Sequence, residues 1–243
     1  MKVELLHSTP EGEALIARTG IFYGERSTKN AIRSLMQKGK EAAFEHWRAC
    51  FRLEAEPRSL LKELLIPAPL LKLTQPILSE GDDFVLSGNA RAFRRLIEYA
   101  SAYPLACRIL TPLWEKSNVL FCPEIFPPFD PEEKKEENFF LPKESRGGVS
   151  LWSLFHPAGL SKGELLVHGS ATFCLTGISQ KLSGHLLSQS GASGCLDKEE
   201  TLVTLSFEGW LAGLYFSEER EALDEIGKLL AKHCPPLFDR ENP

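Results

Sequence analysis

The sequence predicts an α+β protein made of two related units, and three observations support this fold class. Strand-like and helix-like periodicities alternate along the 243 residues. The order of these patterns in the first half recurs in the second half. A stretch rich in proline and charge separates the halves. We therefore predict units at residues 1–126 and 149–243, joined by a linker at 127–148. Each unit is expected to be a small, mainly antiparallel sheet packed with helices.

The first strand-like pattern covers residues 47–55, where apolar and polar side chains alternate as in a half-buried strand. Residues 90–100 instead place their apolar side chains on one helical face. In the second half a similar face is formed by Leu223, Ile226, Leu229 and Leu230. Each half is thus predicted to run strand, helix, strand, then one or two helices, which gives an α+β or mixed α/β sandwich.

The predicted linker begins at Pro127 and Pro128 and continues through the charged run at 132–137. Proline removes a backbone donor, and a dense charge cluster cannot be buried. Gly147 and Gly148 end the segment. These features predict the boundary between the units.

The internal repeat rests on features that occur in the same order in each half. Residues 46–53 align with residues 168–175, and each segment leads into a helical stretch that ends in paired leucines. Each half then reaches an apolar strand, at 84–86 and at 202–205. Chance could produce one such match, but the shared order favours duplication.

Composition limits the function classes. Hydrophobic residues make up 43% and charged residues 25% of the chain, which is typical of a soluble globular protein. A net charge of -5 argues against a general nucleic-acid binder. No apolar run approaches the roughly 20 residues that span a bilayer, and the start of the chain lacks a secretory signal. The six cysteines form no C-x-x-C pair, so we expect reduced thiols, no metal site and a cytoplasmic location.

Three segments of the first half carry a resemblance to a known family. Residues 15–23 resemble an N-terminal helix that ends in an aromatic residue. Residues 39–46 resemble a glycine-to-Phe-Glu-His segment that enters a strand, and residues 86–91 resemble an Asn-Ala-Arg junction between a strand and a helix. On these residues the first half resembles the flavin-dependent thymidylate synthase family, also called thymidylate synthase complementing proteins. The internal repeat extends this resemblance to the second half.

The resemblance implies synthesis of dTMP from dUMP with FAD, NADPH and methylenetetrahydrofolate, in a homotetramer. It carries over His46, Asn89 and Arg91 as cofactor-binding residues, and Ser193 matches a family serine in spacing. It also implies dUMP or another nucleotide as a ligand. A homo-oligomer or another protein partner is expected, without nucleic acid or membrane.

The family's Arg-His-Arg-x-x-Ser-x-Asn-Glu loop is altered in both halves. Residues 66–68, Ile-Pro-Ala, stand in place of the Arg-His-Arg triplet in the first half, and residues 188–190, Ser-Gln-Ser, in the second. Guanidinium groups pair with phosphate and stabilise electron-rich flavin. Loss of a single preorganised donor typically costs a few kcal/mol of transition-state stabilisation. Loss of the triplet in both halves therefore favours a protein without catalysis.

Two groups of residues are candidate sites. Asn89, Arg91, Arg94 and Arg95 lie at a predicted helix start, where they could hold a nucleotide phosphate or another anion. The alternative is a solvated helix face in which Arg94 pairs with Glu98.

His46 and Ser193 also have two interpretations each. His46 is either a flavin contact or a hydrogen-bonded structural residue at the start of a strand. Ser193 lies in a loop of small residues that either cradles a phosphate or forms a flexible turn.

Three functions follow. The first is a divergent flavin-dependent thymidylate synthase with most of its catalytic signature lost. The second is a non-catalytic pseudoenzyme that acts as a structural or regulatory partner. The third is a flavin- or nucleotide-binding module without turnover.

Overall fold

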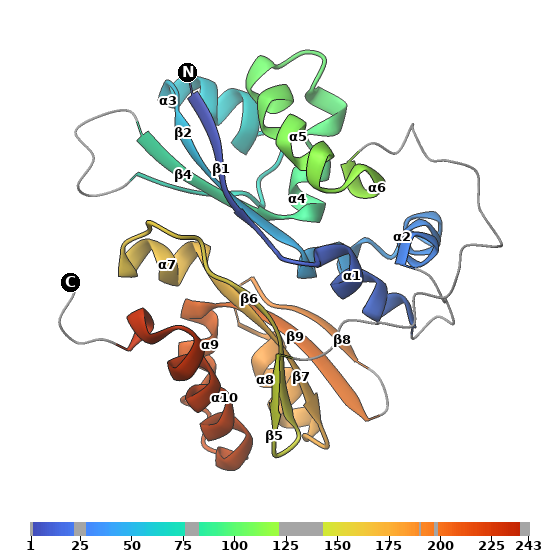
Figure 1. The fold of residues 1–243 in the computed structure, drawn as a ribbon, viewed down its shortest axis with the longest axis vertical. Helices are drawn as coiled ribbons and strands as arrows, with labels where there is room; N and C mark the ends of the chain where they lie inside the picture. Colours follow the sequence, from blue (N-terminus) through green and yellow to red (C-terminus); the bar gives the residue numbers. More distant parts are fainter. Residues whose placement is uncertain are drawn as a thin grey trace. The chain divides into compact units, whose positions relative to one another are not determined.

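In a computed structural model the chain forms two compact units, residues 1–139 and 140–243 (Figure 1). The structure describes residues 2–21, 28–75, 83–121, 143–189, 191–196 and 199–238. Each unit contains its own antiparallel sheet together with helices, so the fold class is α+β as predicted. No helix within the described ranges is long and apolar enough to cross a bilayer.

The first unit is built on a four-stranded antiparallel sheet with the strand order β1-β2-β4-β3. Its strands are β1 (Lys2–Ser8), β2 (Arg48–Glu54), β3 (Lys72–Thr74) and β4 (Asp83–Asn89). In β2 the side chains from Arg48 to Phe51 are all buried, so the predicted half-buried alternation is wrong for this stretch. The turn after β1 lies against this end of β2, because the backbone N–H of Thr9 donates to the carbonyl of Arg48 at 2.8 Å.

The helices of the first unit are mostly short. They are α1 (Gly12–Ile21), α2 (Thr28–Gln37), η1 (Glu41–His46), α3 (Pro57–Leu60), η2 (Leu61–Leu65), α4 (Ala90–Arg94), η3 (Ile97–Tyr99), α5 (Pro104–Lys116) and α6 (Asn118–Phe121). Two of them, η1 and η3, are 3-10 helices, whereas η2 is a π-helix. The single helix expected over 90–100 is wrong, because the α-helix ends at Arg94. The N–H of Arg95 donates to Ala92 and that of Leu96 to Phe93, and these i to i+3 bonds tighten the chain.

The second unit is built on a five-stranded antiparallel sheet with the order β5-β6-β7-β9-β8. Its strands are β5 (Glu144–Arg146), β6 (Val149–Phe155), β7 (Ser170–Thr176), β8 (Ser193–Leu196) and β9 (Glu200–Ser206). Its helices are α7 (Lys162–His168), α8 (Gln180–Leu187), α9 (Phe207–Gly213), α10 (Arg220–His233) and the 3-10 helix η5 (Pro235–Leu237). The apolar face predicted for the last long helix is confirmed, since its four aliphatic residues are buried in α10.

The two units share one strand plan. The order β1-β2-β4-β3 of the first unit matches β6-β7-β9-β8 of the second, with β5 as an addition at the edge. At the end of β4 the N–H of Ala90 donates to Trp47 at 2.8 Å, and at the end of β9 the N–H of Phe207 donates to Gly169 at 3.2 Å. The equivalent strands therefore end in equivalent backbone bonds.

The cores also contain matching aromatic pairs, between β2 and α4 in the first unit and between β7 and α9 in the second. Phe51 meets Phe93 edge to face, with ring centroids 5.6 Å apart. Phe173 meets Trp210 in the same way at 4.9 Å. All four side chains are fully buried. Edge-to-face pairs are favourable because the positive ring edge meets the negative ring face.

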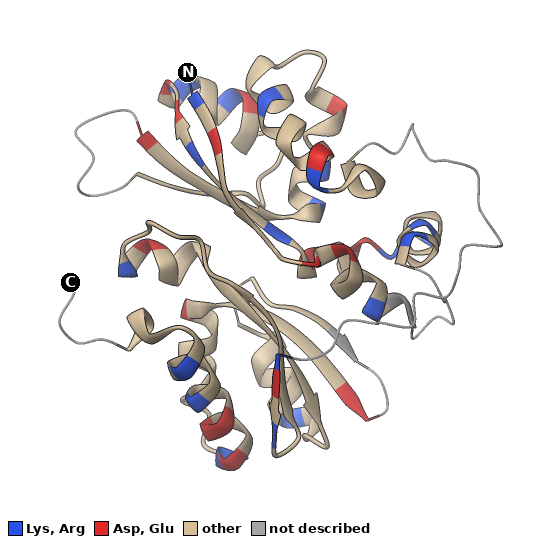
Figure 2. Cartoon of the chain, in the orientation of Figure 1, with Lys and Arg blue, Asp and Glu red and all other residues tan. Residues whose placement is uncertain are grey.

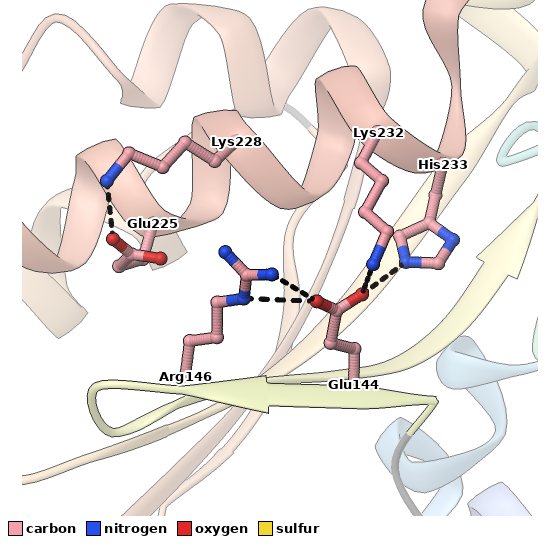
Figure 3. Close-up of polar contacts among 6 residues, drawn as sticks. All are labelled: Glu144, Arg146, Glu225, Lys228, Lys232 and His233. Carbon is pink, nitrogen blue, oxygen red and sulfur yellow. Dashed lines mark hydrogen bonds and ion pairs between the residues drawn. The ribbon is translucent and has the colours of Figure 1, made fainter.

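The end of the predicted linker belongs to the second unit. Residues 127–142 lie outside the described residues, but Glu144 to Arg146 form β5 and pair with β6. The carboxylate of Glu144 contacts Lys232 at 2.6 Å, His233 at 2.9 Å and Arg146 at 3.0 Å (Figure 3). Hydrogen bonds from Lys232 and then His233 lower the pKa of Glu144 to about 2. This ion cluster holds the β5 edge against α10.

Charged residues are distributed differently over the strands of the two sheets (Figure 2). The central strand β2 carries Arg48, Arg52 and Glu54, whereas β6 and β7 carry no charged residue. In the second unit, Thr172 and Thr204 instead share a buried hydroxyl–hydroxyl hydrogen bond of 2.7 Å.

Candidate functional site

The candidate site lies where β2 begins and β4 ends in the first unit. In the antiparallel register Arg48 faces Asn89, so the segments before β2 and after β4 meet at one end of the sheet. The helix η1 precedes β2 and packs on α4, which follows β4. The fold therefore brings His46, Asn89, Arg91 and Arg94 to this end of the first unit.

His46 is the last residue of η1 and is only 2% exposed. Burial, and secondly the charge of Arg48, lower its pKa to about 4. The imidazole is therefore neutral at pH 7 and adds no positive charge to the site. This geometry favours the structural interpretation of His46, while a flavin contact stays a prediction.

Asn89 ends β4 and caps α4. Its side-chain oxygen accepts the N–H of Ala92 at 2.8 Å, as an N-cap residue does. The side chain is thus used within the chain, and a five-residue helix offers little dipole to a ligand.

Arg91 meets two carboxylates from η1. Its guanidinium donates to Glu45 at 2.6 Å and lies 3.7 Å from Glu41. The Arg91 side chain is 36% exposed, so it could reach a ligand only by sharing or leaving these partners. Sequence analysis did not weigh these carboxylates, although the segment Glu41 to Glu45 could have suggested them.

Arg94 ties several elements together. It donates to the carbonyl of Leu120 at 2.7 Å, and its guanidinium carbon lies 5.2 Å from the ring centre of Phe44. Burial lowers its pKa, while Glu41 opposes that effect. Arg94 was expected to pair with Glu98, but it donates to the carbonyl of Leu120 instead. Arg95, by contrast, is exposed.

Ser193 belongs to the other compact unit. It begins β8, is buried, and pairs in register with Thr204 of β9. Ser193 was expected in a loop of small residues, but it is the first residue of β8 and is paired with β9.

Sequence analysis missed Arg48, which it assigned to the polar face of a strand. Arg48 is 6% exposed, and burial lowers its pKa to about 10 although Glu45 raises it. Its N–H donates to the hydroxyl of Thr9 at 2.8 Å. Only its place beside His46 at the strand start could have marked it.

A second missed feature is a cavity of about 540 Å³ at the turn between β1 and α1. No motif marks this turn. Trp47, Glu11 and Lys116 come from three separate segments of the first unit and meet there.

The described ranges contain no group of three or more His, Cys, Asp or Glu residues that could hold a metal ion. No model of a known protein family matches the chain, and no curated protein matches it either. The site must therefore be interpreted from its own geometry.

Proposed function

We propose that this chain is a non-catalytic protein, divergent from the flavin-dependent thymidylate synthase family it resembles, that acts through contact with protein rather than through turnover. One observation carries this proposal. The polar side chains at the junction are engaged by the chain itself, as Arg91 is by Glu45 and Arg94 by the carbonyl of Leu120.

The electrostatics support the same conclusion. A dUMP phosphate or a reduced flavin needs excess positive charge. Around Arg91 the carboxylates of Glu41 and Glu45 already balance the guanidinium, and His46 is neutral. An incoming phosphate would have to compete with two fixed carboxylates.

The segment that stands in place of the family's charged loop favours protein contact. Leu61, Ile66 and Leu70 are 54%, 68% and 59% exposed, although large apolar side chains are usually buried. In the π-helix η2 the N–H of Ile66 donates to Leu61 at 3.0 Å, so these two side chains lie one turn apart on the same side. We take the partner to be a second copy of this chain, in line with the assembly that the resemblance implies.

Flavin uptake tests the absence of catalysis. The purified protein is mixed with excess FAD, desalted, and examined by visible absorbance, with an active flavin-dependent thymidylate synthase treated in parallel. We expect no retained flavin and no dUMP-dependent formation of dTMP. Near-stoichiometric flavin, or turnover above a protein-free control, would overturn the proposal.

Two matched variants distinguish the proposed function from the alternative, a nucleotide-binding module without turnover. Arg91→Gln removes the paired guanidinium, and Arg95→Gln removes an exposed one from the same segment. We expect neither to change dUMP binding by calorimetry, because neither arginine serves that ligand. Loss of measurable dUMP affinity in Arg91→Gln alone would favour the module.

Sedimentation velocity tests the protein contact. The double variant with Leu61→Ser and Ile66→Ser should shift an oligomer toward monomer. Tyr215→Ser, at a side chain 88% exposed in the second unit, serves as the control and should leave the assembly unchanged. A wild-type chain that is monomeric at high concentration would exclude self-association.

A further inference from the structure

The cavity at the turn between β1 and α1 is large enough for a small molecule. Its volume of about 540 Å³ lies within the roughly 300–1,000 Å³ typical of ligand pockets. The residues that matter for its chemistry are His7, Ser8, Glu11, Glu13, Trp47 and Lys116. All of them belong to the first unit.

The walls are fixed by packing. A Cβ atom added to Gly12 would fall 1.5 Å from Cδ1 of Trp47, so the start of α1 lies directly on the indole. Trp47 is 3% exposed, and its ring centre lies 5.3 Å from that of Phe121. Thr9 bonds the turn to β2 in both directions, as donor to and acceptor from the backbone of Arg48. The turn and the indole that border the cavity are therefore held in place before a ligand enters.

The cavity contains charges of both signs. Glu11 and Glu13 come from the start of α1, and Lys116 from the last turn of α5. Glu13 accepts a hydrogen bond from the hydroxyl of Ser117, which holds its carboxylate in place. Within the part of the chain that the structure describes, no ion pair is formed by Lys116 or by the carboxylate of Glu11. Opposite charges thus line one cavity without neutralising each other.

We propose that this cavity binds a small zwitterion of the amino-acid class. The ligand's ammonium group is held by Glu11 and Glu13, its carboxylate by Lys116, and its carbon chain by the indole of Trp47. A ligand with both charges gains from the acidic and from the basic side chains, whereas a singly charged ligand leaves one of these two kinds unpaired.

The same charges discriminate against a nucleotide. A phosphate dianion would gain from Lys116 but would meet the carboxylates of Glu11 and Glu13. The proposed site therefore differs, in its residues and in its ligand chemistry, from the site around Arg91 where β2 begins and β4 ends. It stands independently of the function proposed above, because it requires no protein partner and no flavin.

Two isomeric probes test the zwitterion: L-norvaline, with adjacent charged groups, and 5-aminopentanoate, with separated ones. Pentylamine and pentanoate provide the single charges. Calorimetry with the full chain at low salt should give saturable binding of at least one zwitterion and weaker binding of both singly charged compounds. Norvaline binding would indicate an α-amino acid, and 5-aminopentanoate binding an ω-amino acid.

Charge-removing variants test the assigned residues. Glu11→Gln and Lys116→Gln should each raise the dissociation constant of the zwitterion by about threefold to tenfold. This is the effect expected from the loss of one partly exposed charge contact. Glu98→Gln and Lys62→Gln remove exposed charges outside the cavity and should leave the dissociation constant of the zwitterion unchanged. All four positions are exposed, so unfolding temperatures should match the wild type.

The proposal is overturned if neither zwitterion binds saturably at millimolar concentration. It is also overturned if pentylamine or pentanoate binds as tightly as the zwitterions, or if Glu11→Gln and Lys116→Gln behave like their controls.

Discussion

The two units share one strand order but differ at one corner of the sheet, the pair of residues joined by the backbone bond that follows β4 or β9. The large and the small residue of this pair exchange places between the units. In the first unit the large residue Trp47 precedes β2 and the small residue Ala90 follows β4. In the second unit the small residue is Gly169 and the large one is Phe207, across the equivalent backbone bond. A Cβ at Gly169 would fall 2.4 Å from the Phe207 ring. Of the two residues joined by this backbone bond, the large one precedes β2 in the first unit, whereas in the second unit it follows β9.

The exchange also changes what each corner can do. Trp47 in the first unit lies against Gly12 and forms one wall of a cavity that contains charged groups. Two residues after His46 the first unit has the charged Arg48, whereas two residues after His168 the second unit has the hydroxyl of Ser170. Both histidines are buried, so the difference lies in their neighbours. Ligand chemistry is thus expected at the first corner.

The largest expected effect comes from the matching aromatic pairs. Phe51→Ala and Phe173→Ala each remove a fully buried ring and should cost about 3–5 kcal/mol of unfolding free energy. Urea unfolding followed by tryptophan fluorescence measures this loss. Tyr215→Ala, at an exposed side chain, should change stability by less than about 0.5 kcal/mol. A loss below about 1 kcal/mol in one unit alone would break the equivalence of the two cores.

A smaller effect is expected at Gly12, which lies against the indole of Trp47. Gly12→Ala forces a methyl group into Trp47 and should destabilise the chain by about 1–3 kcal/mol. Gly184→Ala is the matched substitution within α8, where no heavy atom lies within 4 Å of the added carbon. It should stabilise by about 0.5–1 kcal/mol. Thermal unfolding of both variants checks the sign, and equal shifts would contradict the packing described.

The smallest effect is expected at the ion cluster of Glu144 with Lys232, His233 and Arg146 in the second unit. The folded pKa of Glu144 is about 2, below its ordinary value of 4.5. The carboxylate therefore stabilises the fold above pH 4.5, and this contribution is lost as the pH falls toward 2. Glu144→Gln should lower stability at pH 7 and have little effect near pH 2.

Urea unfolding at pH 7, 4 and 2 follows that dependence, with Glu98→Gln as an exposed control. A Glu144→Gln deficit that stayed constant across this range would show that packing, and not charge, holds β5 to α10.

The sequence was sufficient for features that depend on neighbours along the chain. The periodicity over Leu223 to Leu230 predicted a buried helix face, which α10 confirms. The end of α4 was not predictable in the same way. It depends on i to i+3 bonds and on the contact of Arg94 with a carbonyl 26 residues further along.

The same limit applies to the candidate site. The Arg91 cluster could be recognised from sequence, but its neutralisation by Glu45 is a contact between residues 46 positions apart. Arg48 was assigned to a polar face because alternation reports only the local pattern. Burial of its side chain depends on where the turn after β1 lies. Long-range pairings of this kind decide whether a charged residue is available to a ligand.

The contacts of Glu144 with Lys232 and His233 join residues 88 and 89 positions apart. They link the first strand of the second unit to its last long helix, so the two ends of this unit lie side by side. A chain whose ends are adjacent can be closed by a short connection and reopened elsewhere. The turn between β6 and α7, around Gly159, is a suitable place for new ends. The second unit should therefore keep its strand order when circularly permuted there.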